Sequence, residues 1–146
     1  MRYLLDTNVV LRTVNQDDGL YPVVSQAVQN LAIQGHELIL VPQVIYEFWS
    51  AASRPAAVNG LGWSLATVRA LVDDLIREWT LLEDVPEVFD HWLELVTLHQ
   101  VSGKQVHDAR LVAAMKAHDL EHLLTLNAED FGRFDVQSLH PGEVLA

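Results

Sequence analysis

Short apolar segments alternate with longer amphipathic segments along this sequence, and the alternation limits the folds that the chain can adopt. The short segments are rich in Leu, Ile and Val, as expected for strands that are covered on both faces. The longer segments have apolar residues at three- and four-residue spacing, which is typical of helices that bury one face. Strands that alternate with helices predict an α/β fold, a sandwich with a mainly parallel central sheet flanked by helices.

Several boundaries of the predicted elements have a chemical cause. Pro42 stands where a first helical turn would begin, because a proline loses no hydrogen bond at that position. Ser64 is suited to cap the helix that follows it, and Gly35 is suited to end the helix that precedes it. We expect strands at 2–5, 37–41, 80–83, 122–126 and 136–139, and helices at 23–34, 43–53, 64–79, 86–101 and 108–118.

A single domain accounts for the whole length of the chain. The sequence has 146 residues, of which 50% are hydrophobic, and one domain commonly contains about 100 to 200 residues. The segment 54–63 contains proline and glycine, but periodic segments continue directly on both sides of it. We therefore predict a loop there and one domain over residues 1–146.

The composition excludes several classes of protein. The chain has no cysteine, so a disulfide scaffold and thiolate metal sites are excluded. Apolar runs stay well short of the roughly 20 residues that cross a bilayer, and Asp6 interrupts the N-terminus before a signal peptide could develop, so we expect a cytoplasmic protein without membrane contact. The net charge of −11 disfavours long-range attraction to nucleic acid and favours divalent cations and basic partners.

Polar residues follow two of the predicted strands directly. In parallel sheets, sites form beyond the carboxyl ends of the strands. Asp6 follows the first strand, with Thr7 and Asn8 as further oxygen donors, although an aspartate there also suits a helix cap or an Asx-turn. Asn127 and Asp130 follow the strand at 122–126 and are placed to turn toward the same edge, although a surface loop explains them equally.

Two further carboxylates lie on predicted helices. Glu47 falls about 60° outside the apolar stripe of its helix, past the edge at Val44. That position allows Glu47 to face a cleft, although a solvated glutamate is the simpler interpretation of this residue alone. Asp108 lies on the same helical face as the apolar Leu111 and Met115 and so points inward, where a carboxylate is paired, hydrogen-bonded or bound to a metal. Alternatively, Asp108 caps its helix.

These positions together predict one acidic pocket. Carboxylates brought close together repel and raise one another's pKa unless a cation compensates their charge. Oxygen ligands with open water positions suit Mg²⁺ or Mn²⁺ better than Zn²⁺. Such a site can activate a water molecule and neutralise a phosphodiester transition state. The sequence therefore predicts metal-dependent hydrolysis of a phosphate ester.

Four motifs, taken in order, resemble those of a known family. They are Leu-Leu-Asp-Thr-Asn at 4–8, Val-Ile-Tyr-Glu-Phe at 44–48, His-Asp-Ala at 107–109 and Thr-x-Asn-x-x-Asp-Phe at 125–131. The chain resembles the PIN-domain ribonucleases and, within them, the VapC-type toxins of toxin–antitoxin pairs. This resemblance implies a PIN-like three-layer sandwich and a Mg²⁺-dependent endoribonuclease that cleaves structured RNA such as transfer or ribosomal RNA. It further implies a cognate antitoxin and a homodimer.

The resemblance also assigns roles to the site residues. Asp6 and Asp108 resemble the two aspartates that hold Mg²⁺ or Mn²⁺, and Glu47 resembles the acidic residue that completes the metal pocket and helps deprotonate the attacking water. Asn127 occupies the fourth family position, and because it is neutral a second metal ion would be held more weakly. Asp130 either compensates for this missing charge or fixes the loop.

Other residues near the motifs admit a functional and a structural interpretation. The basic neighbours that could contact phosphates are Lys104, His107, Arg110 and Arg12. Arg110 is nearly opposite Asp108 on the helix, so a solvated role is favoured for it. The spacing of His118 and His122 suggests zinc, but the predicted helix end between them disfavours such a site.

Two alternatives to the nuclease hypothesis come from other functional classes. The neutral Asn127 motivates the first, a catalytically weak or inactive PIN fold that binds RNA or protein as a regulatory module. The second is a phosphotransfer fold with an aspartate at a strand end. The phosphatases of that kind require a second aspartate where Asn8 stands, which disfavours them.

Overall fold

The computed structural model describes residues 1–144, and its centre is a parallel sheet. The sheet has five strands in the order β3-β2-β1-β4-β5, and every neighbouring pair is parallel. The strands are β1 (Arg2–Leu5), β2 (Glu37–Leu40), β3 (Thr80–Leu81), β4 (His122–Leu124) and β5 (Gln137–Leu139). The predicted α/β fold with a parallel sheet is confirmed.

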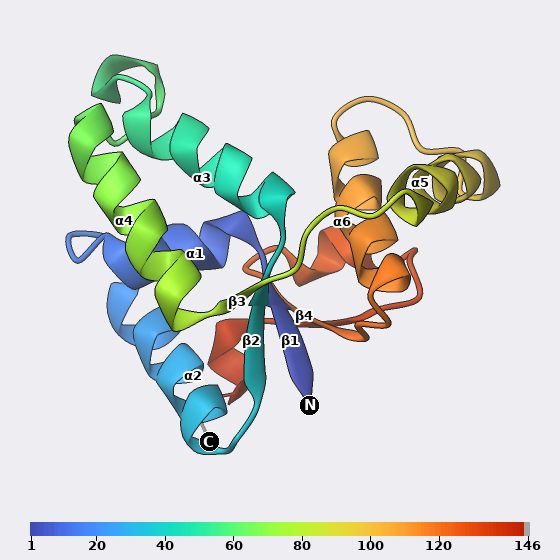
Figure 1. Cartoon of the computed structure of the whole chain (residues 1–146), viewed down its shortest axis with the longest axis horizontal. Coiled ribbons are helices and arrows are strands. Elements are labelled where there is room, and N and C mark those ends of the chain that lie inside the picture. Colours follow the sequence, from blue (N-terminus) through green and yellow to red (C-terminus); the bar gives the residue numbers. More distant parts are fainter. Residues whose placement is uncertain (145–146) are drawn as a thin grey trace.

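Helices cover both faces of this sheet. Figure 1 shows the first four helices on one side and the last two on the other. The helices are α1 (Thr7–Val14), α2 (Tyr21–Ile33), α3 (Pro42–Ser53), α4 (Leu65–Glu78), α5 (Glu87–Leu98) and α6 (Gln105–Ala117). Short 3-10 helices lie at Ala56–Val58, Ala128–Phe131 and Pro141–Val144. The arrangement has three layers, as predicted.

The core lies between the sheet and the two helical layers. The central strands are buried on both faces, and Leu4, Ile39 and Leu123 are wholly inaccessible to solvent. This explains why these strands are continuous apolar runs and do not alternate between apolar and polar residues. The edge strand β3 is only two residues long and partly exposed, so the predicted strand at 80–83 is shorter than expected.

The predicted chemical boundaries hold in the structure. Pro42 is the first residue of α3. The Ser64 hydroxyl accepts a hydrogen bond from the Thr67 N–H at 3.2 Å and caps α4. Gly35 has φ +87° directly after α2, where its N–H donates to the Ala32 carbonyl at 3.0 Å. A residue with a side chain would be strained in this conformation.

The loop at 54–63 folds back onto α3. The Leu61 and Trp63 N–H groups donate to the carbonyls of Ala51 and Ala52, both at 3.0 Å. These hydrogen bonds tie the loop to the last turns of α3. Within residues 1–144, the helices are too short and too polar to cross a membrane.

Candidate active site

Asp6 stands at the carboxyl end of β1 and caps α1, so both of its predicted positions are realised. One carboxylate oxygen, Oδ1, accepts from the Thr7 N–H at 2.7 Å. The other, Oδ2, accepts from the Thr125 hydroxyl at 2.8 Å and from the Asn8 amide at 3.4 Å. Burial raises the pKa of Asp6, hydrogen bonds from Thr125 and Thr7 oppose the rise, and repulsion by other carboxylates adds to it. The backbone and side-chain donors fix the orientation of this carboxylate.

Glu47 lies on α3 and faces the same pocket. Its Oε1 accepts from the Thr7 hydroxyl at 2.9 Å, and its Oε2 accepts from the Gln43 side-chain amide at 3.2 Å. Thr7 thus contacts Asp6 through its N–H and Glu47 through its hydroxyl. Glu47 is partly buried and held by two donors, which contradicts the alternative of a freely solvated glutamate.

Asp108 lies in the first turn of α6 and does not cap that helix. The helix begins at Gln105, and Lys104 occupies the cap position, so the capping alternative for Asp108 is wrong. The reason is that α6 starts three residues earlier than the apolar periodicity indicated. The inward face is as predicted, because Leu111 and Met115 are both buried.

Electrostatic repulsion links Asp108 to the other carboxylates. Burial raises the pKa of the Asp108 carboxyl to about 6. The rise is reinforced by three neighbouring carboxylates, in decreasing order Asp6, Asp130 and Glu47, and opposed by His107. Asp6 is likewise repelled by Glu47 and Asp130. These four carboxylates, which come from four different segments of the chain, therefore lie within electrostatic reach of one another and form one acidic cluster, called the acidic pocket below.

Asn127 and Asp130 differ in how they relate to this pocket. Both are exposed on the segment that follows β4. The Asn127 N–H donates to the Thr125 hydroxyl at 3.1 Å, and the Asp130 N–H donates to the Asn127 carbonyl at 3.0 Å. Asp130 repels both Asp6 and Asp108, so its charge acts on the pocket. Asn127, by contrast, contacts Thr125 and Asp130 through its backbone N–H and carbonyl groups.

Two neutral side chains of the site were not expected from the sequence. Thr125 is wholly buried and donates to Asp6 while it accepts from the Asn127 N–H. Gln43 is four residues before Glu47 on α3 and donates to its carboxylate. The four-residue spacing on a helix was the available signal for Gln43, because residues at that spacing are neighbours on a helix surface.

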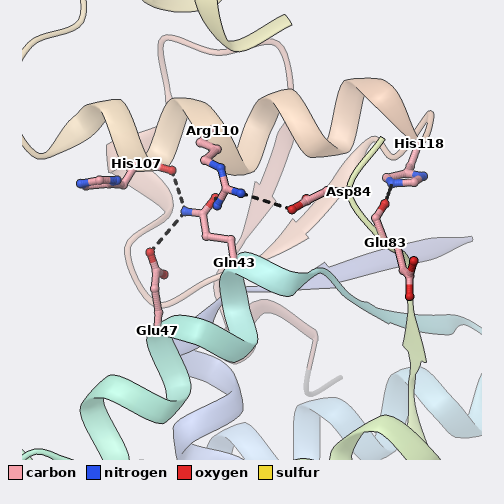
Figure 2. Close-up of polar contacts among 7 residues, drawn as sticks. All are labelled: Gln43, Glu47, Glu83, Asp84, His107, Arg110 and His118. Atoms are coloured by element: carbon pink, nitrogen blue, oxygen red, sulfur yellow. Dashed lines mark hydrogen bonds and ion pairs between the residues drawn. The ribbon is translucent and has the colours of Figure 1, made fainter. Parts of the chain in front are cut away.

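Arg110 is partly exposed, with 36% of its side chain accessible, and it also contacts two side chains. Its guanidinium donates to the Gln43 side-chain oxygen at 3.3 Å and pairs with Asp84 at 3.3 Å. Figure 2 shows Arg110 between these two residues. Helical periodicity gives the direction of the Cβ of Arg110, but the side chain is long, so its guanidinium lies away from that direction. Among the other basic candidates, Arg12 pairs with Asp18 at 3.3 Å.

The two histidines with zinc-like spacing have separate partners. The His118 ring contacts the Glu83 carbonyl at 2.8 Å, as Figure 2 shows. The His122 ring packs against Tyr3 with a distance of 5.0 Å between ring centroids.

The chemistry of the acidic pocket fits a hard divalent cation. Within residues 1–144, the ion pairs use only carboxylates outside the pocket, namely Asp18, Asp73, Asp74 and Asp84. In their present arrangement, the same residues contain no group of three or more histidine or acidic side chains that could hold a metal ion. The four carboxylates of the acidic pocket form no ion pair within residues 1–144, although His107 partly offsets the charge of Asp108. They present the oxygen donors that Mg²⁺ and Mn²⁺ prefer. A cation would offset the repulsion that raises the pKa of Asp6 and Asp108.

Solved structures of similar fold include components of toxin–antitoxin complexes. VapBC2 from Rickettsia felis, bound to a DNA fragment from its promoter, matches with a TM-score of 0.73 and 17% identity, covering 96% of this chain and 98% of that chain. FitAcB from Neisseria gonorrhoeae matches with a TM-score of 0.67 and 18% identity, covering 95% and 97%. VapC20 from Mycobacterium tuberculosis, described as a sarcin–ricin-loop-cleaving toxin, matches with a TM-score of 0.66 and 15% identity, covering 92% and 97%.

At these identities the likeness establishes a shared fold. No curated protein sequence matches the chain significantly. The sequence profile of the PIN domain matches residues 3–137, a span that includes all four motifs and all four pocket carboxylates. The chain therefore belongs to the PIN-domain family, which confirms the resemblance seen in its sequence.

Proposed function

We propose that this protein is a Mg²⁺-dependent endoribonuclease and acts as the VapC-like toxin of a type II toxin–antitoxin pair in the cytoplasm. One observation carries the proposal. Hydrogen bonds through Thr7 join Asp6 to Glu47 on α3, and Thr125 joins Asp6 to the segment after β4. Asp108 on α6 and Asp130 lie within electrostatic reach of this group. Membership of the PIN-domain family supports a nuclease role for that pocket.

Asp6, Asp108 and Glu47 would hold the cation, with Mn²⁺ as a possible substitute for Mg²⁺. The bound ion would supply Lewis-acid stabilisation of the phosphate and a more acidic water. Thr7 and Thr125 orient the carboxylates of Glu47 and Asp6 through neutral donors, so they leave the negative charge of the pocket in place. Glu47 would accept a proton from the attacking water.

Asp130 is the better candidate for the fourth acidic position. It is charged and repels Asp6 and Asp108, whereas Asn127 is neutral. We propose that Asp130 contributes charge to the pocket and that Asn127 positions the segment through its backbone contacts with Thr125 and Asp130.

The proposed partners are structured RNA, an antitoxin and a second copy of the chain. The net charge of −11 favours a basic segment of the antitoxin over long-range attraction to RNA. Exposed apolar side chains on α5, Phe89 and Leu98, are available for a protein interface. The similarity to a structure described as a toxin–antitoxin complex from Klebsiella pneumoniae supports an antitoxin as a partner.

RNA cleavage by purified protein tests the proposal. Total RNA is incubated with the protein over a wide range of Mg²⁺ and Mn²⁺ concentrations, with Asp6→Asn as the inactive control. Asp73→Asn is a matched control, because Asp73 is an exposed residue paired with Arg69 on α4. We expect cleavage by the parent and by Asp73→Asn. RNA that is bound but not cleaved above the Asp6→Asn background would support the regulatory binding module instead.

A further inference from the structure

Gln43 is a buried amide at the centre of a hydrogen-bond network that joins α3 to α6. Only 6% of the residue is exposed. Its Nε2 group donates to Oε2 of Glu47 at 3.2 Å and to the backbone carbonyl of His107 at 2.9 Å. Its Oε1 accepts from the Arg110 guanidinium at 3.3 Å. Figure 2 shows Gln43 between these three partners.

The partners fix which way round the amide lies. Glu47 and the His107 carbonyl can only accept hydrogen bonds, and the Arg110 guanidinium can only donate them. A flipped amide would place its oxygen against two acceptors and its NH₂ group against a donor, and so would lose all three bonds. Asp84 holds Arg110 in turn at 3.3 Å. The donor end of Gln43 is therefore held toward Glu47 and α6.

The bond to His107 also gives Gln43 influence over Asp108. His107 directly precedes Asp108 in the first turn of α6, and it is 64 residues from Gln43 in the sequence. The Gln43 amide thus fixes the Glu47 carboxylate on α3 relative to the turn of α6 that carries Asp108. Glu47 and Asp108 repel each other, so a neutral tie between their elements opposes their separation.

We propose that Gln43 is a positioning residue, which holds Glu47 and the first turn of α6 in the arrangement that binds the divalent cation. The proposal rests on the metal site of the proposed function and specifies what organises it. Gln43 does so by its two donated hydrogen bonds, without contact with the metal. Arg110 contributes by fixing the orientation of the amide.

Binding of Mn²⁺ without RNA tests this role. Gln43→Met keeps a similar side-chain length but has no donor, so we expect its Kd for Mn²⁺ in calorimetric titration to rise about tenfold, the scale typical of residues that orient metal ligands. Gln26→Met is the matched control, because Gln26 is an exposed glutamine on α2 whose amide contacts Asn30 at 2.8 Å. We expect its Kd to equal that of the parent. Thermal unfolding of both variants shows whether they are folded.

A second background separates positioning from a general structural role. When Gln43→Met is combined with Glu47→Ala, the loss of Mn²⁺ affinity caused by Gln43→Met should shrink, because the carboxylate that Gln43 orients is gone. An equal loss in both backgrounds would contradict the proposal. If the parent binds Mn²⁺ and Gln43→Met binds it equally well, the inference on Gln43 fails while the metal site stands. If the parent does not bind Mn²⁺ at all, both fail.

A metal-free measurement covers the case in which Gln43→Met does not fold. In the parent, the side-chain NH₂ protons of Gln43 should exchange with solvent much more slowly than those of the exposed Gln26. The reason is that both NH₂ protons of the buried Gln43 are donated to protein acceptors. Glu47→Ala should accelerate the exchange. Exchange at the rate of Gln26 in the parent would overturn the proposal.

Discussion

At the scale of single residues, neutral hydroxyls organise the acidic pocket. Thr125 donates to Asp6 at 2.8 Å and Thr7 donates to Glu47 at 2.9 Å. A hydroxyl orients a carboxylate without cancelling its charge, whereas an arginine or lysine would form an ion pair and compete with a cation. The pocket therefore keeps the negative potential that attracts a divalent ion.

Removal of either proposed metal-binding aspartate should abolish activity. Asp6→Ala and Asp108→Ala each remove a charged ligand from a site that has few, so the loss of activity should exceed the 10- to 100-fold typical for residues that only support a ligand. Calorimetric titration with Mn²⁺ should show weakened binding in both variants. Unchanged Mn²⁺ affinity in both would refute their assignment as ligands.

The raised pKa of Asp108 predicts how stability changes with pH in the metal-free protein. In the folded state the pKa is about 6, above the ordinary value of 3.8 that applies to the unfolded chain, so the folded state binds more protons between these values. Stability should therefore fall as the pH rises from 3.8 to about 6. Urea unfolding in the presence of a chelator should show this decline in the parent and a weaker one in Asp108→Asn. Parallel pH profiles for the two proteins would contradict it.

At the scale of elements, helix boundaries could be predicted wherever a residue marked them chemically. Pro42, Ser64 and Gly35 each occupy the position that their chemistry indicated. The start of α6 carried no such mark, since the cap residue Lys104 has no capping side chain, and the predicted start was three residues late. The short helix α1 was not among the predicted helices, although its apolar residues favour one face, because its eight residues make little more than two turns.

Only those site residues that belong to the motifs or follow a predicted strand could be identified from the sequence. Asp6 and Asp130 follow parallel strands that end at the same edge of the sheet, which the alternation of elements indicated. Gln43 and His107 are 64 residues apart in the sequence, so no local sequence pattern predicts the contact between the Gln43 side chain and the His107 carbonyl. The ion pair of Arg110 with Asp84 likewise depends on how α6 packs against the segment before α5.

The turn after α3 should be intolerant of even one added carbon. A Cβ at Gly60 would lie 1.8 Å from the Arg54 carbonyl oxygen, whereas a Cβ at Gly19 would meet nothing within 4 Å. Gly60→Ala should lower the free energy of unfolding by about 1 to 3 kcal/mol, the range for overpacked sites. Gly19→Ala is the control and should unfold like the parent in urea. Equal midpoints for the two variants would show that the turn relaxes freely.

At the scale of the whole molecule, the net charge of −11 has to be separated from the local charge of the pocket. Asp6, Glu47, Asp108 and Asp130 account for a small part of the acidic residues, and a bound cation would offset part of their negative charge where a phosphate would arrive. The remaining excess lies elsewhere on the molecule. It should make the encounter with RNA weak and salt-sensitive, and the encounter with a basic antitoxin segment favourable.

The protein should also associate with itself. Self-association follows from the proposed VapC-like role, and the exposed apolar side chains of α5 offer a surface for it. Sedimentation equilibrium should give the mass of a dimer, twice the 16.4 kDa of one chain. A monomer at high concentration would contradict this expectation.

The central claim is that the acidic pocket uses a divalent cation to cleave RNA. Its most direct test is the cleavage of total RNA by the parent and by Asp108→Asn, with and without Mg²⁺, followed by analysis of the new RNA ends. We expect cleavage that requires Mg²⁺ and Asp108 and that leaves no 2′,3′-cyclic phosphate, because the attacking group is water. Cleavage that persists without a divalent cation, or that Asp108→Asn performs as well as the parent, would contradict it.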